Sequence, residues 1–245
     1  MNNREAADLR GGSALRAPGE VERHSKDVKG WAPGQPPGDP EAAQRLQEWL
    51  EGEEGGLDVA GLDFSGADLS QGDFSESWFT GSKLVNVKLI DADLYRSDAQ
   101  GADFTGADLT RVSLVRVNLD DAVLRRVILD GADLVKASLC DVDASRASCR
   151  GTRFMGASLL YVDLRGADLT DAVLRENSFK VAMNHATILQ GVSGSIFGPV
   201  EIFEQDSVRT LGGAALEDWI REKGGNVQVI SGTCPMKYRS PKSPT

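Results

Sequence analysis

Apolar residues recur at every fifth position over about half of the chain. From Phe64 to Phe179 this series gives 24 consecutive positions with no polar residue and no slip of phase. A second series lies two residues earlier and is mostly small, as at Ala67 and Ala107. Neither a helix, with a period of 3.6, nor a strand, with a period of 2, produces a period of five. The pattern predicts a repeat in which each unit of five sends two side chains inward.

A single unit of this kind does not fold by itself. Ordering five residues costs on the order of 5–10 kcal/mol of backbone entropy, whereas burying one Leu and one Ala returns roughly 3–4 kcal/mol. The units are therefore expected to stack, with backbone hydrogen bonds between neighbouring units supplying the rest.

Units such as GADFT, GADLT, DADLY, GADLV and DAVLR resemble the pentapeptide-repeat family, whose unit is A(D/N)LXX. The resemblance covers roughly residues 57 to 192. It implies an all-β fold, a right-handed quadrilateral β-solenoid with one pentapeptide per side and four per coil. The 24 units then make about six coils, which at about 4.8 Å per coil gives a rod roughly 29 Å long.

The flanking segments predict caps and tails. Residues 1–39 have a Pro/Gly-rich composition with balanced charge, which predicts a disordered tail. Residues 40–56 are expected to form a capping helix, with Asp39 as N-cap, Pro40 first, and Leu46, Trp49 and Leu50 on one face. Residues 57–192 are expected to form the solenoid. Residues 193–230 predict a β/α cap with strands at PVEIFE and NVQVI, a helix at GGAALEDWIREKGG and Trp219 inward. Residues 231–245 predict a flexible tail.

No constellation of residues indicates catalysis. The two histidines, His24 and His185, have no partner at metal-ligand spacing, and no phosphate-binding motif with a Lys-Ser/Thr is present. The aspartates that recur just before each inward residue are expected to bond to turns and to water. Of the cysteines, Cys149 is expected to point inward and Cys140 outward, so these two do not bridge. We therefore predict a protein that is not an enzyme and that needs no metal or cofactor.

Composition and charge limit the classes of partner that this chain is expected to bind. The chain carries 37 Asp and Glu against 27 Lys and Arg, which argues against direct nucleic-acid binding. Its longest near-apolar run is too short to span a bilayer, and its first residues show no secretion signal. A cytoplasmic protein without a membrane partner is expected.

The outward positions, taken in steps of twenty residues, give two candidate faces. The first is an apolar stripe, which suggests a protein partner or a homodimer seam; ordinary strand propensity is the alternative explanation. It consists of Tyr95, Val115, Val135 and Met155, with Leu160 and Tyr161 around the next corner. The second is an acidic patch of Asp98, Asp120, Asp121 and Asp141, for which a solvated surface is the alternative.

These features predict a non-catalytic protein-binding or scaffold protein in a bacterial protective or regulatory setting. The resemblance also implies an alternative, because known family members protect DNA gyrase as acidic imitations of duplex DNA and confer antibiotic or toxin resistance. Residues 57–181 carry 20 acids and 14 bases, about a third of the charge density of DNA. A further alternative is a targeting module that binds through residues 200–230, with the solenoid as spacer.

Overall fold

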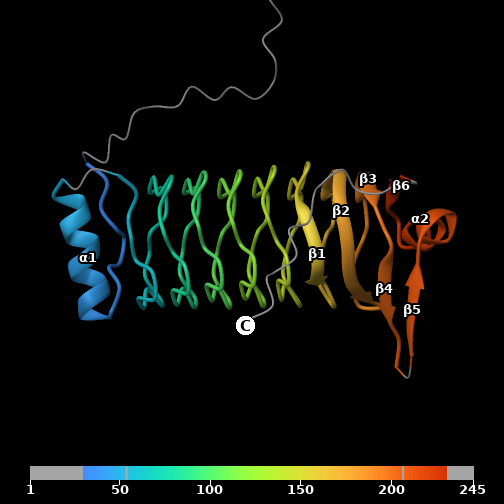
Figure 1. Cartoon of the computed structure of the whole chain (residues 1–245), viewed down its shortest axis with the longest axis horizontal. Helices are drawn as coiled ribbons and strands as arrows, with labels where there is room; N and C mark the ends of the chain where they lie inside the picture. Colours follow the sequence, from blue (N-terminus) through green and yellow to red (C-terminus); the bar gives the residue numbers. More distant parts are fainter. Residues whose placement is uncertain (1–29, 53–54, 206, 231–245) are drawn as a thin grey trace, which may run out of the picture.

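A computed structural model describes residues 30–52, 55–205 and 207–230. Figure 1 shows a straight rod of stacked coils, with helix α1 (Pro40–Leu50) at one end and helix α2 (Gly213–Glu222) at the other. Residues 1–29 of the tail expected at 1–39, and the whole tail expected at 231–245, lie outside the described residues.

The coils of the rod are joined by backbone pairing at a fixed interval. From Asp58↔Trp78 to Asp168↔Ile188, the isolated bridges within the repeats are parallel and join residues twenty positions apart. Each unit bonds to the coil on either side: the Phe104 amide donates to the Val123 carbonyl at 2.8 Å, and the Asp103 amide donates to the Ser82 carbonyl at 2.9 Å. The backbone polar groups are thereby satisfied along the rod, as burial requires.

The inward series forms one continuous core. Each of the 24 residues from Phe64 to Phe179 is buried, as are the small residues two positions earlier. Hydroxyl groups also enter this core, and they donate to backbone carbonyls 23 residues earlier: Ser82 Oγ to Val59 at 2.8 Å, and Thr152 Oγ1 to Leu129 at 2.7 Å. These hydrogen bonds offset the cost of burying a polar group. The predicted phase is confirmed.

The corner between two sides requires a left-handed residue. Two places after each inward residue from Phe64 to Leu174, φ is positive, for example +65° at Gly101 and +62° at Arg116. Glycine takes this conformation without strain, whereas other residues pay a steric cost there. Most corners nonetheless carry a side chain, so the outer surface of the rod can vary freely in charge.

Helix α1 closes the first coil of the rod. Asp39 Oδ1 accepts the Ala42 amide at 2.9 Å, and Pro40 opens the helix, as predicted. The buried ring of Trp49 stacks on Phe74, with 5.7 Å between the centroids. The helix ends at Leu50, before the expected boundary at residue 56.

The predicted tail boundary at residue 39 is wrong, because residues 30–39 pack on the rod. The Trp31 ring meets Phe74 edge-on at 5.4 Å, and its Nε1 donates to the Ser70 carbonyl at 2.9 Å. Gln35 pairs with Asp68 in an antiparallel bridge. This segment covers an edge that would otherwise be free to pair with another chain.

The other end of the rod widens into a sheet. Strands β1 (Ser158–Asp163) and β2 (Val173–Asn184) continue the coils. The cap is completed by four more strands: β3 (Ser193–Phe197), β4 (Val200–Phe203), β5 (Val208–Leu211) and β6 (Asn226–Val229). The strands of the sheet lie in the order β5-β4-β2-β3-β6, and β1 pairs with β2. The expected strands at β4 and β6 and the helix α2 are present. Leu216 and Ile220 are the buried residues of α2. Trp219, which was expected to point inward, is only half-buried against the core.

Candidate protein-interaction faces

The aspartates that precede the inward residues are held by their own turns. Asp93 Oδ1 accepts the amide of the residue two places later, Tyr95, at 2.9 Å, and the same bond recurs along the rod. Asp68 Oδ1 accepts both the Ser70 hydroxyl, at 2.7 Å, and the Ser70 amide, at 3.2 Å. These bonds, the hydroxyl bond foremost, lower the pKa of Asp68. The structural interpretation of these carboxylates is confirmed.

The predicted apolar stripe lies along one side of the rod, and we call its four residues, Tyr95, Val115, Val135 and Met155, the apolar ladder. Hydrogen bonds fix their stacking: the amides that follow each of the first three donate to the carbonyls of Val115, Val135 and Met155 at 2.9–3.0 Å. All four side chains are half-buried. The ladder begins after Ser75 and ends before Arg175.

Leu160 and Tyr161 lie apart from the ladder, at the cap end of the rod. Leu160 is half-buried, and Tyr161 is 52% exposed. Tyr161 borders a cavity of about 230 Å³ shared with Arg165, Lys180 and Phe203. The Lys180 ammonium lies 4.3 Å from the centre of the Tyr161 ring, and the Arg165 guanidinium lies 4.9 Å from that of Phe203. The rings of Tyr161 and Phe203 are therefore both engaged in cation–π contacts within the protein.

The predicted acidic patch divides into two kinds of carboxylate. Asp98 and Asp120 are half-buried and bonded within the rod: Asp120 Oδ1 accepts the Ser138 hydroxyl at 2.6 Å and the Cys140 amide at 2.8 Å. Asp98 accepts the amide of Gln100 at 3.0 Å. Asp121 and Asp141 are exposed at the corner. Only these two present their charge to solvent.

The two cysteines of the repeats differ as predicted. Cys149 is fully buried, and this burial raises the pKa of its thiol to about 12. Cys140 is half-buried on the outside, beside the hydroxyls of Ser138 and Ser158 at 3.9 and 3.7 Å. A buried, protonated thiol such as Cys149 is unreactive.

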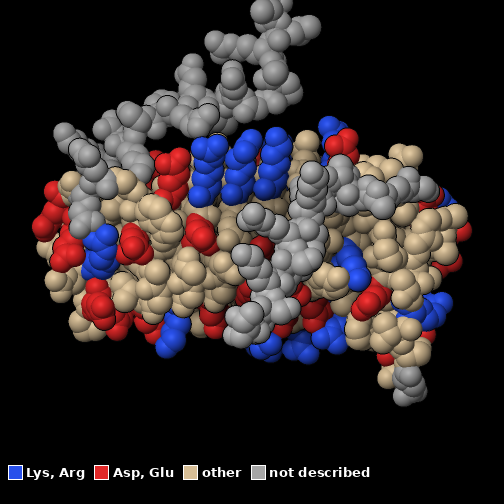
Figure 2. Space-filling view, viewed as in Figure 1, with Lys and Arg blue, Asp and Glu red and all other residues tan. Residues whose placement is uncertain are grey.

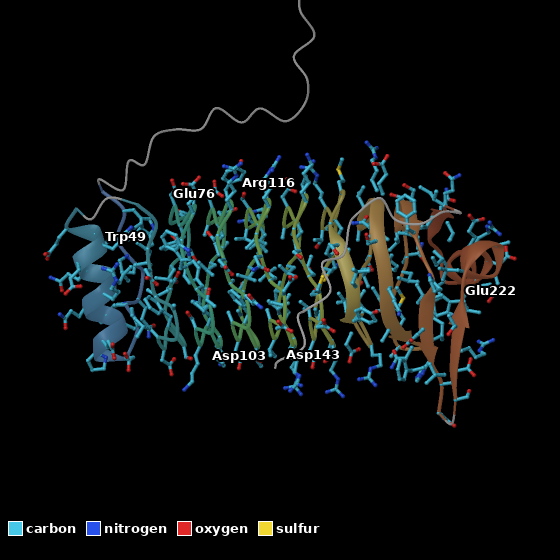
Figure 3. All side chains as sticks on the ribbon, in the orientation of Figure 1. Trp49, Glu76, Asp103, Arg116, Asp143 and Glu222 are labelled. Carbon is cyan, nitrogen blue, oxygen red and sulfur yellow. The ribbon has the colours of Figure 1, made fainter. Side chains whose placement is uncertain are left out.

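A row of bases beside the apolar ladder was missed by the sequence reasoning. Arg96, Arg116 and Lys136 each follow a ladder residue directly, occupy the corner and are exposed. Figure 3 places Arg116 on a long edge of the rod, and Figure 2 shows Lys and Arg side chains in a row along this edge. The twenty-residue step that predicted the ladder would have found them, one place further on.

Within residues 30–52, 55–205 and 207–230, no group of three or more His, Cys, Asp and Glu side chains is arranged to hold a metal ion. Neither described helix is long and apolar enough to cross a bilayer.

Comparison with known proteins identifies the repeat. The family model for pentapeptide repeats matches eight copies, over residues 56–86, 88–126, 102–139 and 132–171. No curated protein sequence matches the chain.

Among solved structures, HetL is similar to this chain, at 26% identity with a TM-score of 0.57, covering 63% of this chain and 71% of HetL. HetL is a pentapeptide repeat protein involved in heterocyst differentiation regulation from the cyanobacterium Nostoc sp. strain PCC 7120. Rfr23 from the cyanobacterium Cyanothece 51142 has 20% identity and a TM-score of 0.39, covering 59% of this chain and 96% of Rfr23. Trypsin-treated QnrB1, a plasmid-mediated fluoroquinolone resistance protein, has 21% identity and a TM-score of 0.33, covering 58% of this chain and 70% of QnrB1.

Proposed function

Because this chain belongs to the pentapeptide-repeat family, we propose that it is a non-catalytic protein-binding scaffold and that the apolar ladder is its docking face. The proposed setting is bacterial and regulatory or protective. A regulatory role is supported by the similarity to HetL, which is itself involved in regulation.

The proposal takes the rod to be a right-handed, four-sided solenoid of about six coils. Its support is the pairing of residues twenty apart, which equals four units of five. A rod of this kind presents outward side chains in straight rows about 4.8 Å apart. Such rows suit the binding of another macromolecule along the rod better than the enclosure of a small molecule.

The observation that carries the proposal is the continuity of the apolar ladder over four successive coils. Isolated apolar residues on a surface are ordinary, whereas a contiguous apolar strip bordered by charge marks an interaction site. Elsewhere in the repeats, the same outward place more often holds a polar residue, such as Thr105, Thr110 or Ser145.

The test is capture of protein partners by the immobilised full chain, compared between three forms. Val115→Ser with Val135→Ser removes the centre of the ladder. Val85→Ser with Ile90→Ser is the matched control, because both residues are half-buried at the same place in the unit but on other sides. The proposal expects a partner retained by the wild type and the control and lost by the ladder variant.

Equal capture by all three forms would overturn the docking face. Sedimentation of the same forms distinguishes a second copy of the chain as the partner: a homodimer seam predicts a dimer that the ladder variant alone dissociates.

Gyrase binding is the second candidate, favoured by the exposed pair Asp121 and Asp141. A gyrase supercoiling assay tests it. This candidate expects inhibition or protection by the wild type that weakens at high salt and in the double variant Asp121→Asn, Asp141→Asn. No effect of the wild type on gyrase would exclude it.

A further inference from the structure

The bases beside the apolar ladder form a row of three like charges, which we call the basic ladder. It consists of Arg96, Arg116 and Lys136, in three successive coils. Arg96 also reaches Glu76 in the preceding coil at 4.0 Å and lies over the Tyr95 ring at 5.4 Å. Arg116 and Lys136 form no ion pair with any described residue. Two of the three charges are therefore open to a partner.

Ion pairing between adjacent coils does not account for this row of bases. At the next corner, Asp91 and Arg111 stand at the equivalent places of adjacent coils, and Arg111 Nε donates to Asp91 Oδ1 at 2.6 Å. That pair shows how the fold stabilises itself with opposite charges. In the basic ladder, three equal charges stack and repel one another, one more than the two stacked arginines at another corner, Arg126 and Arg146. Arg116 and Lys136 also adopt φ of +62° and +59°, where glycine is unstrained.

We propose that the basic ladder and the apolar ladder together bind an amphipathic α-helix with acidic residues along one edge, lying lengthwise on the rod. This inference rests on the proposed function and specifies its partner. Carboxylates of the helix would pair with the basic ladder while its apolar face covers the apolar ladder. The two ladders lie side by side because each base directly follows an apolar residue.

The spacing favours a helix over an extended peptide. Three coils place the bases at about 0, 4.8 and 9.6 Å along the rod. Residues i, i+3 and i+7 of a helix lie at about 0, 4.5 and 10.5 Å along its axis, on one face. Alternate residues of an extended strand lie at about 0, 6.8 and 13.6 Å, which misses the third base by about 4 Å.

The ends of the basic ladder limit the partner's charge. Glu76 occupies the same corner one coil before Arg96, and Glu176 occupies it two coils after Lys136, with Gly156 between. A long polyanion such as a nucleic acid would meet these two carboxylates. The three acidic residues of a helix lie between Glu76 and Glu176 and face only the bases. The charge pattern therefore favours a short acidic stretch.

The experiment uses a fluorescein-labelled helical peptide with Glu at i, i+3 and i+7 beside a Leu face, titrated with the full chain and followed by anisotropy. Controls carry Gln or Lys in place of Glu, or a central Pro that breaks the helix. The variant chain is Arg116→Glu with Lys136→Glu; Glu76 and Glu176 already occupy this corner with φ of +58° and +55°, and circular dichroism verifies its fold.

We expect the Glu peptide to bind the wild type at least tenfold more tightly than the Gln or Pro peptide, with weaker binding at high salt. The variant should lose the Glu peptide and gain the Lys peptide. Equal binding of the Glu and Gln peptides, or undiminished binding by the variant, would overturn the acidic partner. Equal binding of the Glu and Pro peptides would overturn the helix.

The outcome is separable from that of the proposed function. If a captured partner depends on Val115 and Val135 but not on Arg116 and Lys136, the docking face stands and the acidic helix is wrong. If capture depends on neither pair, both are wrong.

Discussion

Replacing Leu119 by alanine tests how the core holds the rod together. Leu119 is fully buried in the middle of the inward series. Its neighbour in the preceding coil is already small: the Ala99 amide bonds to the Asn118 carbonyl at 2.8 Å, which places Ala99 against Leu119. Alanine at both positions leaves a cavity that no adjacent large side chain on that side can fill by a small shift.

The expected cost lies in the upper part of the range for buried leucine, about 3–5 kcal/mol. For a chain of this size, each kcal/mol lowers the melting temperature by about 2–4 °C, so we expect a fall of about 6–20 °C. Thermal melts followed by β-type circular dichroism measure it. Val115→Ser is the matched control, because its side chain is on the outer surface and should cost less than about 1 kcal/mol.

Equal melting temperatures for Leu119→Ala and Val115→Ser would refute the assignment of inward and outward positions. A lower melting temperature for Val115→Ser alone would show that the apolar ladder, rather than the inward series, stabilises the rod.

Three further predictions concern the carboxylates and the first coil. Asp120→Ala should cost about 1–3 kcal/mol, because two half-buried donors, the Ser138 hydroxyl and the Cys140 amide, lose their acceptor. Asp141→Ala should leave the urea midpoint unchanged, and equal effects of the two substitutions would contradict the division of the acidic patch. Gly72→Ala should destabilise by about 1–3 kcal/mol, because the new Cβ would lie 2.4 Å from the Phe74 ring; an unchanged urea midpoint would show that the ring can move. The lowered pKa of Asp68 contributes stability that is present above its unfolded pKa of about 3.9 and is lost as the pH falls through the folded value. The melting temperature should therefore drop from pH 5 to pH 3, and less in Asp68→Asn; parallel curves would contradict this.

The core and the helix at the first coil were predictable because their signals are local and periodic. The inward series needs only the spacing of apolar residues, and Asp39 with Pro40 marks a helix start by capping chemistry. The packing of Trp31 on Phe74 was not predictable in this way. It depends on a contact across more than forty residues from a Pro/Gly-rich segment whose composition resembles a tail.

The cap and the outer faces show where the pattern loses information. Strand β5 has three exposed residues out of four, so no alternation of buried and exposed positions identifies it. The twenty-residue step predicted the position of each outward side chain, and it identified the apolar ladder. The same step did not predict the role of Asp120, because its hydrogen bonds with Ser138 and Cys140 run to the next coil rather than to its own turn.

The most direct test of the docking face is site-specific photocross-linking in the native host. Benzoylphenylalanine replaces Val115 in one form and Thr105, ten residues away and half a coil around the rod, in the other. We expect a discrete protein adduct from position 115 and none from position 105. Adducts of equal yield from both positions, or from position 105 alone, would contradict the assignment of the partner to the apolar ladder.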